Sequence, residues 1–172
     1  EALEVWLVGP AKGGIRGGVT RLSRHADAVT LVDSARHCKV YRGSLRPGPA
    51  LSLEQVESVV RVDGLDVISY PGVFSHGRLD EGTALLLQAL VDAGPRGKAL
   101  DMGCGCGAIT AALAHAGCHV TGSDVSATAV AAACTTLSRN HLQGTFVRGA
   151  LYGGVEGRYQ PLVTYPPCIP VP

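Results

Sequence analysis

Residues 98–107 read Lys98-Ala99-Leu100-Asp101-Met102-Gly103-Cys104-Gly105-Cys106-Gly107, a short apolar run that leads directly into three alternating glycines. The run predicts a buried strand, and the small residues from Ala108 to Ala116 predict a helix immediately after the glycines. The same order repeats at once, with a strand predicted at residues 119–124 and a helix at residues 127–137. Strands and helices that alternate at this spacing form right-handed crossovers between parallel strands. The stretch therefore predicts an α/β fold with a doubly wound, mostly parallel sheet.

Further elements extend this pattern on both sides. A strand is predicted at Val67–Tyr70, where a Pro-Gly pair ends it, and a helix at Leu79–Leu90 with acidic residues in its first turn. After the second helix of the repeat, strands are predicted at Gly144–Arg148 and Tyr159–Thr164.

The first fifty residues contain only short apolar runs. Strands are predicted at Val5–Gly9 and Ala28–Val32, with a glycine-rich turn and a short helix up to His25 between them. Cys38–Tyr41 predicts one more strand, and residues 44–49 have the composition of a turn or linker. These elements are too few to close a sheet of the predicted kind, so we expect them to be the end of something larger or an accessory to the second part.

The composition excludes several classes of protein. The 172 residues are 46% hydrophobic and 17% charged, which supplies a core and excludes intrinsic disorder. Fifteen basic and 14 acidic residues give a net charge of +1, so no overall attraction to nucleic acid is expected. The arginines Arg16, Arg21, Arg24 and Arg36 could face RNA, but a solvated surface is the simpler explanation.

The six cysteines do not predict a disulfide framework or a metal site. The chain is not small, and Cys104 and Cys106 lie inside the glycine loop. His119 follows Cys118, but no CxxC motif or pair of histidines has the spacing of zinc ligands. No apolar run approaches the roughly 20 residues of a membrane span. We therefore expect a cytoplasmic protein with no metal and no membrane partner.

The glycine loop and the acid after it predict a nucleotide-shaped site. Glycines let the backbone turn sharply and approach a ligand, and the helix start offers unpaired N–H groups. Asp124 ends the next strand, where a carboxylate can accept both hydrogen bonds from a ribose diol. Residues 103–108 also satisfy the dinucleotide pattern of nicotinamide oxidoreductases. Asp101 favours S-adenosylmethionine (SAM), because methyltransferases place such a carboxylate near the methionine amino group.

Several separated motifs resemble one family. The segments that carry the resemblance are Tyr70-Pro71-Gly72-Val73-Phe74-Ser75, Leu79-Asp80 with Gly82-Thr83 and Leu85-Leu86-Leu87, Leu100-Asp101-Met102-Gly103-Cys104-Gly105, and Ser123-Asp124-Val125-Ser126. With residues 6–9 and 32–38 near the start, they are similar to the small-subunit (16S) ribosomal RNA guanine-N2 methyltransferases of the RsmC type, which are class I SAM-dependent enzymes. The resemblance covers nearly the whole chain.

The resemblance implies a Rossmann-like class I methyltransferase fold that is incomplete at its carboxyl end. In that family two methyltransferase-like halves are joined, and only the second is catalytic. Residues 1–50 would be the remnant of the first domain plus a linker, and residues 51–172 a partial SAM-binding domain. The implied cofactor is SAM, the acceptor is a guanine exocyclic amine, and the partner is ribosomal RNA or the small ribosomal subunit.

The resemblance also implies a set of cofactor-binding positions. Asp101, Gly103 and Gly105 would line the methionine end, Asp124 would hold the ribose, and the segment with Phe74 would cover the cofactor, although core packing also explains Phe74. The full set is Phe74, Ser75, Asp101, Gly103, Cys104, Gly105, Asp124, Val125 and Ala150.

Two stretches depart from the family pattern. Ala150 stands where the family has an Asp or Asn for the adenine amino group. The catalytic Asn-Pro-Pro-Phe is replaced by Tyr165-Pro166-Pro167-Cys168. An exocyclic amine is a poor nucleophile because its lone pair is delocalised. An Asn oxygen and a backbone carbonyl align it, and an aromatic ring stacks on the base.

Tyr165 supplies no amide oxygen and Cys168 cannot stack, so we expect weak or absent activity. The alternatives are a SAM- or RNA-binding relative without catalysis and, on the glycine pattern alone, an oxidoreductase.

Overall fold

The structure is a computed structural model that describes residues 3–49 and 51–165. The chain divides into two compact units, Glu1–Ala50 and Leu51–Pro172. Each unit has its own sheet, so each is described by itself.

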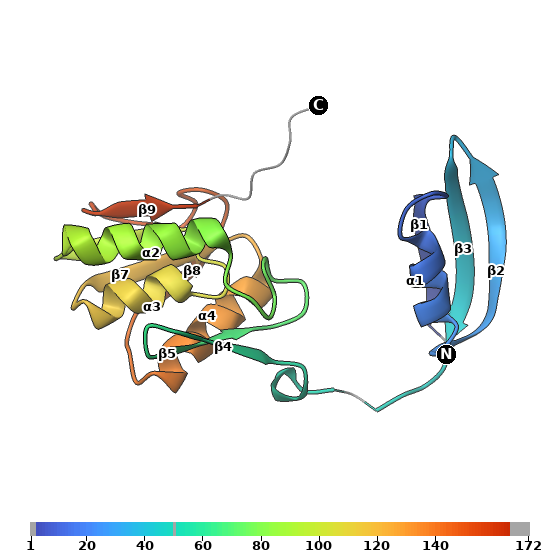
Figure 1. The fold of residues 1–172 in the computed structure, drawn as a ribbon, viewed down its shortest axis with the longest axis horizontal. Coiled ribbons are helices and arrows are strands. Elements are labelled where there is room, and N and C mark those ends of the chain that lie inside the picture. Colours follow the sequence, from blue (N-terminus) through green and yellow to red (C-terminus); the bar gives the residue numbers. More distant parts are fainter. Residues whose placement is uncertain (1–2, 50, 166–172) are drawn as a thin grey trace. The chain divides into compact units, whose positions relative to one another are not determined.

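The first unit is a three-stranded antiparallel sheet with one helix (Figure 1). Its elements are β1 (Glu4–Pro10), α1 (Ile15–Leu22), β2 (Ala26–Ala35) and β3 (Cys38–Leu45). β3 lies between β1 and β2, and α1 packs where Ile15 is buried and Gly18 approaches Leu7. The predicted strands and helix are present. β3 extends to Leu45, where a turn was expected, because Ser44 and Leu45 still pair with Glu4 and Ala26.

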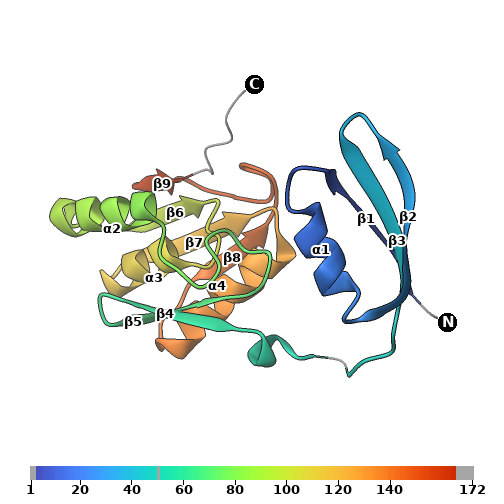
Figure 2. The ribbon, with the colours of Figure 1, turned by 45° about the vertical axis from the view of Figure 1, so that its right-hand side comes forward.

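The sheet of the second unit holds four parallel strands in the order β8-β7-β6-β9. They are β6 (Lys98–Met102), β7 (His119–Asp124), β8 (Thr145–Arg148) and β9 (Leu162–Thr164). β7 and β8 extend from one side of β6 whereas β9 returns to its other side, so the strand order reverses at β6 (Figure 2). This reversal confirms the predicted α/β class with a doubly wound sheet. Such sheets bind ligands at the carboxyl ends of the strands beside the reversal, where the glycine loop lies.

Three helices lie side by side along this sheet (Figure 1). They are α2 (Glu81–Ala93), α3 (Ala108–His115) and α4 (Ala127–Arg139). The Asp80 carboxylate accepts hydrogen bonds from two amides of the first turn of α2, so the helix starts two residues later than predicted. The buried residues that join helices and sheet include Leu87, Ala99, Ile109, Leu113, Val120, Leu137 and Val163.

A hairpin precedes α2, and the sequence predicted only its second strand, at Val67–Tyr70. After a short 3-10 turn, η1 (Leu53–Gln55), strands β4 (Ser58–Val62) and β5 (Leu65–Ser69) pair antiparallel across Asp63 and Gly64. No further strand pairs with β5 in the described part of the chain.

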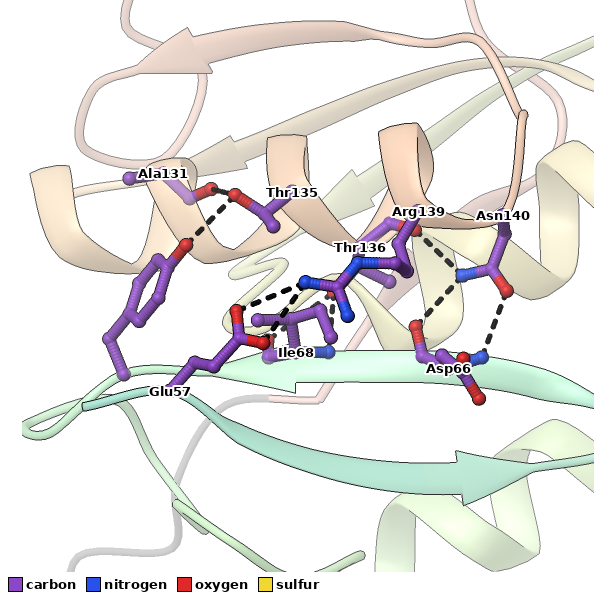
Figure 3. Close-up of polar contacts among 9 residues, drawn as sticks. Glu57, Asp66, Ile68, Ala131, Thr135, Thr136, Arg139 and Asn140 are labelled. Carbon is purple, nitrogen blue, oxygen red and sulfur yellow. Dashed lines mark hydrogen bonds and ion pairs between the residues drawn. The ribbon is translucent and has the colours of Figure 1, made fainter. Parts of the chain in front are cut away.

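Side chains of α4 and of Asn140, the residue after it, satisfy the free edge of β5 (Figure 3). The Asn140 amide accepts from the Asp66 N–H at 2.9 Å and donates to the Asp66 carbonyl at 2.8 Å, as a neighbouring strand would. The Thr136 hydroxyl accepts from the Ile68 N–H at 2.9 Å. Arg139 pairs with Glu57 at 3.0 Å. The hairpin is therefore fixed to α4 by polar contacts, because buried backbone groups need partners.

Candidate functional site

The loop after β6 adopts a backbone that requires its glycines. Gly103, Gly105 and Gly107 have φ angles of 80°, 54° and 81°, in the left-handed region that other residues avoid. A Cβ on Gly103 or Gly105 would point into open space, whereas a Cβ on Gly107 would lie 2.9 Å from the Cβ of Ala133. The first two glycines thus leave the loop open to a ligand, and the third allows α3 to pack against α4.

The loop is held by hydrogen bonds from two neighbouring elements. The Gly103 and Cys104 amides donate to the Ser123 carbonyl of β7 at 2.8 and 2.9 Å. The Thr136 hydroxyl of α4 donates to the Cys106 carbonyl at 2.8 Å. The loop is therefore anchored on both sides before any ligand binds.

Asp101 lies at the carboxyl end of β6 and is fully buried. Its Oδ2 accepts a hydrogen bond of 2.5 Å from the Thr110 hydroxyl of α3. Its Oδ1 has no hydrogen-bond partner in the part of the chain that the structure describes. Burial raises the pKa of this carboxyl to about 6, against the Thr110 hydrogen bonds, and the nearby Asp124 adds to the increase. An unpaired buried acceptor is rare and suits a donor brought by a ligand.

Asp124 ends β7 with its carboxylate fixed in orientation. Oδ2 accepts from the Gly105 amide at 3.0 Å and Oδ1 from the Ser126 amide at 2.8 Å. Each oxygen keeps a second lone pair for a ligand. Val125, next in sequence, is 65% exposed and presents an apolar side chain at the same edge of the sheet.

The segment before α2 meets the glycine loop. Phe74 and Ser75 line a cavity of about 50 Å³ together with Cys104, Gly105 and Tyr165. Phe74 is 52% exposed, so it is not a core residue. The Ser75 Oγ is shielded from solvent without a hydrogen-bond partner among the described residues.

Ser69, at the end of β5, holds the turn that carries Phe74 and Ser75. The Ser69 hydroxyl accepts from the Gly77 amide at 3.1 Å and lies 3.0 Å from Nδ1 of His76.

Tyr165 follows β9 and contacts the start of α2. Its hydroxyl donates a hydrogen bond to the Asp80 carboxylate, and this bond is the main reason why the pKa of Asp80 is lowered. Its ring fills the space beside Gly82, where any Cβ would collide with it. Pro166, Pro167 and Cys168, the remaining positions of the degenerate motif, lie outside the described residues.

The structure gives less support to three other candidate positions, Ala150, Cys104 and Cys106. Ala150 is exposed in a turn after β8, where its carbonyl accepts from the Gly153 amide at 2.8 Å, and it does not line the cavity. Burial raises the pKa of the Cys104 and Cys106 thiols, so both are protonated at neutral pH and neither is an activated nucleophile.

A larger hollow lies at the opposite edge of the sheet. It has a volume of about 540 Å³ and is lined by residues at the amino ends of three strands, among them Lys98, His119 and Thr145. None of the predicted site residues lines it. Within residues 3–49 and 51–165, no group of His, Cys, Asp and Glu side chains could hold a metal ion, and no helix is long and apolar enough to cross a membrane.

The sequence did not predict that two further residues support the site. Thr110 and Asp80 act through hydrogen bonds to Asp101 and Tyr165. A hydroxyl in the first turn of the helix after a glycine loop was the only available signal for Thr110.

Comparison with known proteins assigns the chain to a family. The profile "Methyltransferase small domain" matches residues 64–169, and the profile "Methyltransferase small domain N-terminal" matches residues 1–58. The chain belongs to the methyltransferase small domain family.

Similar members of the methyltransferase small domain family carry the name ribosomal RNA small subunit methyltransferase C. The protein of Alcanivorax borkumensis is 52% identical over 169 residues, which are 97% of this chain and 52% of that protein. The protein of Salmonella gallinarum is 40% identical over 167 residues, which are 96% of this chain and 48% of that protein. The chain thus spans about half the length of these relatives.

A solved structure agrees with this assignment. The T. thermophilus 16S rRNA N2 G1207 methyltransferase (RsmC), in complex with AdoMet and guanosine, matches with a TM-score of 0.83 at 25% sequence identity. The match covers 98% of this chain and 48% of that chain. The predicted Rossmann-like methyltransferase fold is therefore confirmed, and the resemblance drawn from the motifs is correct.

Proposed function

We propose that this chain binds SAM at the glycine loop and belongs to a methyltransferase that acts on a guanine N2 amine in small-subunit ribosomal RNA. The observation that carries the proposal is the loop itself, which is open at Gly103 and Gly105 and flanked by two oriented carboxylates. The relatives named for ribosomal RNA methylation, and the neighbour solved with AdoMet and guanosine, support the same ligand and substrate. Action on the small ribosomal subunit implies a cytoplasmic location.

The residues present fit SAM. The unpaired Oδ1 of Asp101 would accept from the methionine ammonium, and the open faces of Gly103 and Gly105 would admit the methionine chain. Asp124 would hold the ribose hydroxyls through its free lone pairs, and Val125 would lie against the adenine. Phe74, Ser75 and Cys104 would enclose the site. Ala150, at the position that the family pattern assigns to the adenine amino group, offers no polar side chain for it. Bound SAM supplies an electrophilic methyl group on a sulfonium.

A second candidate function is binding without catalysis, and Tyr165 favours it. Its hydroxyl is engaged by Asp80 and its ring by the start of α2, so neither is free to align an exocyclic amine as an Asn oxygen would. We therefore expect SAM binding to be retained and methyl transfer to be weak or absent.

The first unit would be the end of the other methyltransferase-like domain, with residues 1–50 as that remnant and its linker and 51–172 as the SAM-binding part. The amino-terminal family profile over residues 1–58 supports this division. That domain would help to hold the RNA.

Two assays test these proposals together. Calorimetry should give saturable binding of SAM and none of NADH; binding of NADH alone would reject the methyltransferase proposal. Transfer of tritiated methyl from SAM to unmethylated small ribosomal subunits should be at or near background. Robust transfer would reject the argument from Tyr165 and establish the chain as a complete catalyst.

A further inference from the structure

Asp101 and Thr110 form a buried hydrogen-bonded pair in which one carboxyl oxygen is without a partner among the described residues. Both side chains are 0% exposed. The Thr110 hydroxyl, in the first turn of α3, fixes Oδ2 at 2.5 Å and leaves Oδ1 as the unpaired oxygen. A hydroxyl can donate only one hydrogen bond, so Oδ1 needs either its own proton or a donor from outside.

The charges around this carboxyl do not help it to ionise. Asp124, at the end of the adjacent β7, repels its negative charge, and the neighbouring thiols Cys104 and Cys106 are neutral. None of the ion pairs in the described part of the chain includes Asp101. Buried carboxyls without a cation retain a proton more readily.

We propose that Thr110 is a positioning residue that presents Asp101 Oδ1 to a ligand ammonium, and that binding of this ammonium is coupled to loss of a proton from Asp101. The inference rests on the proposed function, because the ammonium is that of the methionine part of SAM. The balance is simple: the carboxyl releases one proton to solvent and becomes an anion, and the ammonium then occupies the place of that proton.

The coupling gives the affinity a defined pH dependence. The free carboxyl has a pKa of about 6, so at pH 5.5 binding releases about three quarters of a proton per ligand. Above pH 6.5 the carboxyl is already ionised and the release disappears. Below pH 6 the affinity falls toward tenfold per pH unit. The α-amino group of the ligand titrates near pH 8. A loss of affinity above pH 8 would therefore come from deprotonation of the ligand and not of Asp101.

Calorimetry on the whole chain measures the coupling directly. SAM is titrated at pH 5.5, 6.5 and 7.5, each in two buffers of different ionisation enthalpy. We expect proton release at pH 5.5, little at pH 6.5, and affinity that is flat between pH 6.5 and 7.5. Binding that releases no proton at pH 5.5 overturns this inference and leaves the proposed function intact. Absence of binding at every pH overturns both.

Variants separate positioning from simple packing. Thr110→Val removes the hydroxyl that stabilises the ionised carboxyl. The fall of SAM affinity at acid pH, which we call the acid limb, should therefore begin at a higher pH in this variant. Thr110→Ser keeps a hydroxyl and should return the acid limb to its original pH. Thr121→Val makes the same change at another buried threonine, in the body of β7, and should leave the limb in place. An unmoved limb in Thr110→Val, with circular dichroism showing a folded chain, overturns the role of Thr110.

A carbon-13 NMR titration of the Asp101 carboxyl in the ligand-free chain measures the pKa of this group without any ligand. A midpoint near pH 6 supports the inference, and a midpoint near 4 overturns it.

Discussion

At the scale of single residues, the three glycines of the loop serve different physical purposes. Gly103 and Gly105 provide a left-handed backbone in front of open space, where a side chain would obstruct a ligand rather than the fold. Gly107 provides the same backbone against α4, where a side chain would obstruct the fold itself. One sequence motif thus divides into a binding part and a packing part.

This division predicts different effects for two alanine substitutions. Gly107→Ala adds strain at φ 81° and a collision with Ala133, so it should lower the free energy of unfolding by about 2–4 kcal/mol. Gly105→Ala should cost about 1 kcal/mol of stability but weaken SAM binding. Urea unfolding and calorimetry of both variants test this. Equal destabilisation by the two would contradict the assignment.

Asp124 should matter for affinity through its orientation. Asp124→Ala removes the acceptor that holds the Gly105 amide and the two lone pairs proposed for the ribose. Hydrogen bonds to charged groups contribute about 1.5–3 kcal/mol, so the dissociation constant for SAM should rise at least about tenfold. An unchanged constant, measured by calorimetry, would remove Asp124 from the site.

Asp101 should also make the stability of the ligand-free chain depend on pH. Its folded pKa of about 6 lies above the ordinary 3.8, so its contribution is present below pH 3.8 and is lost as the pH rises through 6. The difference corresponds to about 3 kcal/mol. Relative to Asp101→Asn, the unmodified chain should gain unfolding free energy between pH 7.5 and pH 4 in urea titrations. Parallel profiles would contradict a buried, protonated carboxyl.

At the scale of elements, the hairpin β4–β5 is joined to the site through one side chain of α4. Thr136 binds the Ile68 amide of β5 and the Cys106 carbonyl of the glycine loop, and it is fully buried. The free edge of the hairpin and the ligand loop therefore share a partner. Disturbing that partner should affect both.

Thr136→Val should lower the free energy of unfolding by about 2–4 kcal/mol, because two buried backbone groups lose their partners, and should also weaken SAM binding. Thr135→Val is the matched control, since Thr135 contacts the Tyr70 hydroxyl and its own helix. It should cost about 1 kcal/mol and leave affinity unchanged. If Thr136→Val destabilises the chain without changing affinity, the link to the loop is absent.

Elements could be predicted from sequence where one local pattern determines them. The parallel strands and the helices after them follow from apolar runs and glycine stops, and β7 was predicted with its full extent. β4 was missed although Asp63-Gly64 between two apolar runs is a hairpin signal.

The contacts of Thr110, Thr136 and Asp80 could not be predicted in this way. They join residues that are 9, 68 and 85 positions apart, and only the packed structure brings the partners together.

At the scale of the whole molecule, the candidate site lies in one of two compact units. The chain spans about half the length of relatives that carry a methyltransferase name, and it holds the cofactor-type loop in its second unit. The candidate site is at the carboxyl edge of the sheet, whereas a larger hollow lies at the amino edge. Chemistry, rather than size, distinguishes the two.

The most direct test of the central claim is therefore to locate SAM on the chain. Nitrogen-15 NMR of the whole chain during a SAM titration should shift the amide signals of residues 103–107 and of Asp124 and Val125 first and most. Signals of Lys98, His119 and Thr145 at the opposite edge should stay in place. Shifts that gather at those three residues, or no shifts at saturating SAM, would contradict the assignment of the glycine loop as the SAM site.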